Sequence, residues 1–62
     1  MTEQEKRVKN FLKRVKECMA DGRMTDATYF MGCADAAAGK ERDVNALHPV
    51  YHQGYDDEAA NG

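Results

Sequence analysis

The sequence lacks several residues and patterns that common protein functions require. It contains no serine and no tryptophan, only one proline, and no apolar run near the roughly 18 residues that span a membrane. The N-terminal segment lacks the apolar core of a signal peptide. We therefore expect a cytoplasmic protein that does not enter a membrane.

These absences also argue against catalysis. Without serine, a nucleophilic site would have to combine Cys18 or Cys33 with a histidine. At 62 residues the chain forms a single small domain (1–62), which is too thin to enclose a pocket of about 300 Å³. We expect a non-enzymatic protein without a cofactor.

The two cysteines and two histidines do not have the spacing of a metal site. Zinc sites usually contain pairs such as Cys-x-x-Cys, and Pro49 keeps His48 off the helical face of His52. In a helical hairpin Cys18 and Cys33 lie about one turn out of level, which strains a disulfide. We expect two buried free thiols and no metal.

Charge is divided unevenly along the chain. Residues 1–23 contain seven basic and four acidic side chains, whereas residues 24–62 contain two basic and seven acidic ones, for a net charge of −2. This division indicates either neutralisation within the molecule or association between molecules.

The clearest helix is predicted from residue 3 to residue 21. Thr2 and Glu5 have the spacing of a capping box at its start, and Gly22 suits its C-terminal end. Apolar residues recur on one face of about 120°. These residues are Val8, Phe11, Leu12, Val15, Cys18 and Met19.

A second helix is predicted at residues 26–38, capped by Thr25 or Asp26 and followed by Gly39. The short turn before it makes the two helices an antiparallel hairpin. Pro49 suits the first turn of a shorter third helix at 49–59. No segment shows β-alternation, so the predicted fold class is all-α.

Three acidic residues, Asp56, Asp57 and Glu58, come late in the third helix. The helix dipole disfavours negative charge at that end. We therefore expect residues 59–62 to be a frayed tail.

The chain contains a weak internal repeat. Residues 29–38 can be aligned with residues 51–60, so that a tyrosine, a glycine, an aspartate and two alanines coincide. We expect the second and third helices to cross at Gly32 and Gly54, where the missing side chains let two backbones approach. Chance similarity in an alanine-rich chain is the alternative.

Part of this pattern is shared with a known family. The relevant residues are Tyr29, Gly32, Ala36, Gly39, His48, Pro49, Tyr51, Gly54 and Tyr55. Over residues 29–58 the chain resembles the ribosome modulation factor family and its small phage and bacterial relatives. The resemblance implies a compact helical hairpin that binds ribosomal RNA and silences ribosomes.

Two groups of residues are candidate binding surfaces. The first combines aromatic and acidic residues that could anchor a protein partner. They are Tyr29, Tyr51, Tyr55, Asp56, Asp57 and Glu58. The tyrosines could instead cap the small core, and the carboxylates could be a solvated tail.

The second group is a lysine stripe on the first helix that could follow the phosphates of a nucleic acid. It consists of Lys6, Lys9, Lys13 and Lys16. A solvated helix face is the alternative interpretation.

From these patterns we expect a small protein-binding module, of the kind that a phage encodes to inhibit or modulate a host protein. Its partner is another protein, and homodimerisation is left open. The alternative is a regulatory factor that binds RNA or the ribosome.

Overall fold

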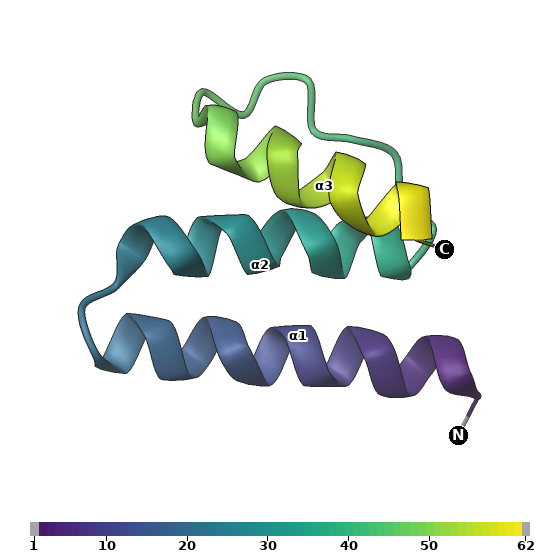
Figure 1. Cartoon of the computed structure of the whole chain (residues 1–62), viewed down its shortest axis with the longest axis horizontal. Helices are drawn as coiled ribbons and strands as arrows, with labels where there is room; N and C mark the ends of the chain where they lie inside the picture. The colour runs from purple at the N-terminus through teal and green to yellow at the C-terminus, as the bar shows by residue number, and fades with distance from the viewer. Residues whose placement is uncertain (1, 62) are drawn as a thin grey trace.

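The computed structural model describes residues 2–61, which form three helices and no strand. They are α1 (Glu3–Ala20), α2 (Met24–Ala37) and α3 (Pro49–Asn61). Figure 1 shows α1 and α2 as an antiparallel pair, with α2 lying between α1 and α3. The predicted all-α fold, a hairpin followed by a shorter helix, is confirmed. Within the described residues, no helix has the length and apolar character needed to cross a membrane.

Helix α1 has the predicted ends to within one residue. The Thr2 hydroxyl accepts a hydrogen bond from the Glu5 backbone N–H at 3.1 Å. At the other end Gly22 has a φ of 78°, which a glycine adopts without strain. The N–H of Arg23 donates to the Cys18 carbonyl, which completes a Schellman turn.

Helix α2 begins two residues earlier than predicted. Its N-cap is Arg23, which makes no side-chain capping bond, so neither Thr25 nor Asp26 caps the helix. The turn at Gly22 leads the chain directly into helical geometry, so Thr25 and Asp26 lie in the first turn of α2. There Asp26 pairs with Arg23 at 3.6 Å, and its charge suits the positive end of the helix dipole.

Helix α3 also extends beyond its predicted end. It continues through Ala59, Ala60 and Asn61, where the sequence predicted a frayed tail. Alanine is the best helix former, and an ion pair between Glu58 and Arg7 of α1 holds the preceding turn. Residue 62 of the predicted tail lies outside the described residues.

The core is thin, as the length of the chain requires. Its buried apolar residues are Val15, Cys18, Ala27, Cys33, Ala34 and Tyr51. Both thiols are free and buried. The rings of Phe11 and Phe30 stack at the α1–α2 interface with centroids 6.3 Å apart.

Helices α2 and α3 meet through two glycines. A methyl group on Gly32 would overlap the carbonyl oxygen of Tyr51 and lie 2.9 Å from the Tyr55 nitrogen. A methyl group on Gly54 would overlap the carbonyl oxygen of Tyr29 and lie 3.0 Å from its carbon. The two backbones therefore touch, and only hydrogen fits at either position.

The direction of α3 determines the path of the connecting segment. Figure 1 shows that α3 runs in the same general direction as α2 rather than back along it. The segment from residue 38 to residue 48 must therefore return along the length of α3 before that helix begins. This returning segment forms one wall of the groove described below.

Replacing Gly54 with alanine should destabilise the protein strongly. The added methyl would force α3 away from the Tyr29 carbonyl, so we expect the free energy of unfolding to fall by about 3 kcal/mol. Urea denaturation followed by circular dichroism measures this change. The exposed neighbour Gln53 is the control, and Q53A should change stability by less than about 0.5 kcal/mol. Equal stability of G54A and wild type would contradict the close crossing.

Candidate functional site

The two copies of the internal repeat hold each other by reciprocal hydrogen bonds. The Tyr29 hydroxyl donates to Asp57 at 2.6 Å, and the Tyr51 hydroxyl donates to Asp35 at 2.6 Å. The two tyrosines are equivalent in the repeat, and so are the two aspartates. Each tyrosine of one helix thus bonds the aspartate of the other, across the glycine crossing. The repeat has a structural role, because it forms the α2–α3 interface.

This interface changes the acidity of three groups. The hydrogen bond to Asp57, with burial and the nearby negative charge, raises the pKa of Tyr29 to about 12. Burial, followed by the hydrogen bond to Asp35, raises the pKa of Tyr51. Burial also raises the pKa of the Cys33 thiol, and the charge of Glu58 adds to it. A thiol with a raised pKa is a poor nucleophile, so Cys33 suits a structural role.

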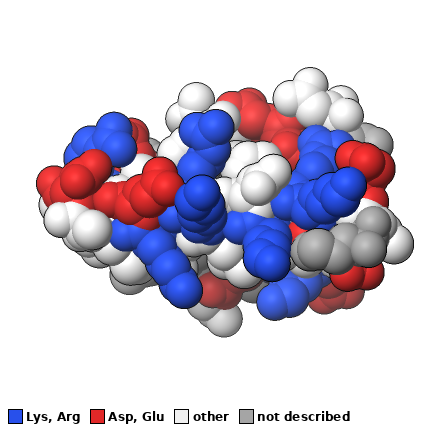
Figure 2. All heavy atoms as spheres, turned by 90° about the horizontal axis from the view of Figure 1, so that it is seen from below, with Lys and Arg blue, Asp and Glu red and all other residues white. Residues whose placement is uncertain are grey.

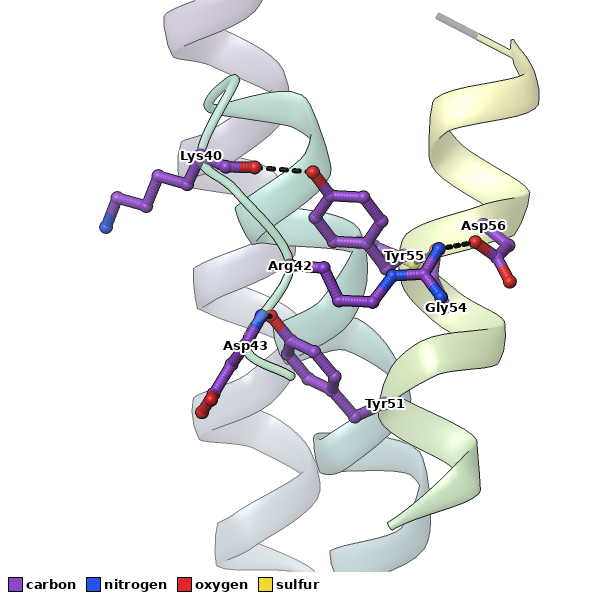
Figure 3. Close-up of polar contacts among 8 residues, drawn as sticks. Lys40, Arg42, Asp43, Tyr51, Gly54, Tyr55 and Asp56 are labelled. Carbon is purple, nitrogen blue, oxygen red and sulfur yellow. Dashed lines mark hydrogen bonds and ion pairs between the residues drawn. The ribbon is translucent and has the colours of Figure 1, made fainter. Parts of the chain in front are cut away.

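Figure 3 shows how α3 holds the segment that follows α2. The Tyr55 hydroxyl donates to the Lys40 carbonyl, and the Arg42 guanidinium pairs with Asp56. The same guanidinium lies 5.0 Å from the centre of the Tyr55 ring. The Asp43 N–H donates to the Tyr51 hydroxyl at 3.2 Å. These contacts fix residues 40–43 against α3.

The residues predicted to bind a partner are therefore used inside the molecule. Tyr51 is buried, with 6% of its surface exposed, and the buried Glu58 pairs with Arg7. Tyr29, Tyr55, Asp56 and Asp57 each bond another part of the chain. The sequence could not separate a tyrosine that caps a core from one that anchors a partner. The structure favours the first interpretation for all three tyrosines.

The lysine stripe has the opposite character. Lys6, Lys9, Lys13 and Lys16 are all exposed. Within residues 2–61 none of them forms an ion pair. Figure 2 shows the face of the molecule on the α1 side, where Lys and Arg side chains gather in the middle and acidic groups lie toward both ends. The stripe is about 15 Å long, since Lys6 and Lys16 are ten positions apart in the helix.

The structure also contains an apolar groove that sequence reasoning missed. The groove has a volume of about 330 Å³ and lies between α1, α2 and the returning segment. Its apolar residues are Leu12 of α1, Met31 and Ala34 of α2, Ala46 and Leu47 of the returning segment, and Tyr51 of α3. We call this site the Leu47 groove.

Large apolar side chains in the Leu47 groove face water. Leu47 is 91% exposed, Leu12 is 48% exposed and Met31 is 43% exposed. Apolar residues at helical spacing in α1 and α2 were visible in the sequence. Nothing in the sequence placed Leu47 beside them, because the path of residues 38–48 is set by the direction of α3.

The histidines and cysteines do not assemble into a catalytic or metal centre. His48 lines the Leu47 groove, whereas the Nε2 atom of His52 lies 3.0 Å from the Ala46 carbonyl oxygen. Over residues 2–61, no three His, Cys, Asp or Glu side chains are close enough together to bind a metal.

Comparison of the chain with protein-family models, with curated proteins and with solved structures found no match.

Asp57→Asn should restore a more ordinary acidity to Tyr29. Asp57 is the main cause of the raised Tyr29 pKa, so we expect this pKa to fall from about 12 toward 10 in the variant. In the wild-type protein, the Tyr29 hydroxyl contributes stability below pH 10 and loses that contribution between pH 10 and 12. NMR of the Tyr29 ring during alkaline titration measures the pKa. An unchanged pKa in D57N would contradict the assigned hydrogen bond.

Proposed function

We propose that this chain is a non-catalytic protein-binding module that inhibits or modulates another protein. The observation that carries the proposal is the Leu47 groove. A small protein that leaves Leu12, Met31 and Leu47 exposed together presents apolar surface of the kind used in protein interfaces. The groove replaces the tyrosines and carboxylates as the proposed binding surface, because those groups are engaged within the chain.

The apolar lining of the groove supports a short apolar element of a partner as its ligand. The lining residues come from α1, α2, the returning segment and α3. A groove with exposed leucine and methionine side chains suits the apolar face of an amphipathic helix, which inserts side chains one turn apart. A phage-encoded inhibitor of a host protein would be one protein-binding module of this kind.

A Leu47→Asp variant tests this proposal. Leu47 makes no contribution to the core, so the variant should fold normally while placing a charge at the groove. We expect L47D to lose proteins that the wild type captures from a cell lysate. Val44→Asp is the matched control, because Val44 lies in the same segment, is 81% exposed and does not line the groove. Equal capture by all three proteins would contradict the proposal.

A second candidate function is binding to RNA or to the ribosome through the lysine stripe. The specific observation in its favour is that the four lysines are exposed and form no ion pair within residues 2–61. The resemblance to the ribosome modulation factor family supports the same function. The net charge of −2 weighs against it, because the rest of the molecule repels phosphates.

A salt titration of RNA binding tests the second candidate. Four lysine–phosphate contacts with a single strand give a slope of log K against log salt of about −3. We expect Lys9→Glu to weaken binding at low salt, whereas Lys40→Glu, which makes the same charge change outside the stripe, has a smaller effect. No measurable RNA affinity at low salt would exclude this function.

A further inference from the structure

The Leu47 groove has rims of opposite charge. On the α1 side, Leu12 lies one turn from both Lys9 and Lys16, which are exposed. On the side of the returning segment, Asp43 lines the groove, and Asp35 of α2 lines it as well. An apolar channel therefore separates a basic rim from an acidic one.

This arrangement selects among possible occupants of the groove. A nucleic acid or a uniformly acidic peptide would meet repulsion at the Asp43 rim, and a uniformly basic peptide would meet it at the Lys9 and Lys16 rim. A second copy of the same chain carries both a basic and an acidic rim, so it can avoid both repulsions. In a two-fold dimer whose axis runs along the groove, the same patch faces itself, and the basic rim of each copy lies against the acidic rim of the other.

The thin core gives an independent reason for a second copy. Within residues 2–61 no large side chain is completely buried, and the buried apolar residues are mostly small. Domains of this size usually need a disulfide, a metal or a partner subunit to gain stability. The two cysteines are free, and among the described residues no three His, Cys, Asp or Glu side chains lie close enough together to hold a metal. Burying Leu12, Met31 and Leu47 against a second copy would enlarge the apolar core.

We propose that the chain forms a two-fold homodimer in which the Leu47 grooves of the two copies close on each other. This inference rests on the proposed function, since both use the same groove. The chain is a dimer when its partner protein is absent. A partner protein must then displace the second copy, so self-association and partner binding compete.

Sedimentation equilibrium of the purified chain tests the dimer. We expect a concentration-dependent mass that approaches twice the 7.0 kDa of one chain. L47D should weaken the dimer at least about tenfold, because a carboxylate would enter the apolar interface. The control V44D should dimerise like the wild type, because Val44 does not line the groove.

A charge-exchange pair tests the orientation of the two copies. One variant carries Lys9→Glu and Lys16→Glu, which makes both of its rims acidic, and the other carries Asp43→Lys, which reduces the acidic rim. Each variant alone should dimerise more weakly than the wild type, because like charges face each other. An equimolar mixture should form the heterodimer in preference to either homodimer. Loss of folding could not produce this preference, so the result distinguishes the proposed interface from an unfolded variant.

Three outcomes would overturn the dimer. A chain that stays monomeric at high concentration has no such interface. A dimer that L47D leaves intact uses another surface, and a mixture without preferential pairing has the rims arranged differently. The proposed function is tested separately, by capture with L47D. If the wild type is monomeric and L47D still loses captured proteins, the groove binds another protein and only the homodimer is wrong.

Discussion

The direct contact of the α2 and α3 backbones at Gly32 and Gly54 is the constraint on which the rest of the molecule depends. With hydrogen as the only side chain at these positions, the carbonyl oxygens of Tyr29 and Tyr51 approach the opposite helix. That approach brings each tyrosine hydroxyl to an aspartate across the crossing, which ties together two helices with little apolar surface. The segment between residues 38 and 48 must then follow a long return path, and the Leu47 groove results from it.

The crossing also explains which surfaces remain for function. A chain with so little apolar material uses its tyrosines and carboxylates to hold the third helix and the returning segment in place. Two of the surfaces that stay exposed are candidates for binding. One is the lysine stripe of α1, and the other is the Leu47 groove with its two oppositely charged rims. Both are suited to binding another macromolecule, and their charges suit different partners.

The helices could be predicted because each depends on neighbours in the sequence. Thr2 and Gly22 mark the two ends of α1. The Thr2 hydroxyl accepts a hydrogen bond from the Glu5 N–H, and the Gly22 N–H donates to the Met19 carbonyl, so residue spacing along the chain was sufficient to predict both ends. The N-cap of α2 was placed wrongly because Thr25 and Asp26 favour a cap locally, while the preceding turn begins the helix sooner. The repeat likewise indicated two glycines at a crossing, since the pattern encodes the geometry of both helices. The ion pair of Arg7 with Glu58, in which only the carboxylate is buried, joins residues 51 positions apart, and no local pattern in the sequence predicted it.

The sequence by itself determined three amphipathic or alanine-rich helices, two buried thiols and a basic first helix. These features follow from residue spacing and composition, which act over one or two helical turns. Only the tertiary structure decided that the tyrosines and carboxylates bond other parts of the chain, that α3 runs alongside α2, and that Leu47 lies beside Leu12 and Met31. The physical reason is that the exposure of a side chain depends on which distant backbone lies next to it. In this chain, two glycines fix that neighbour.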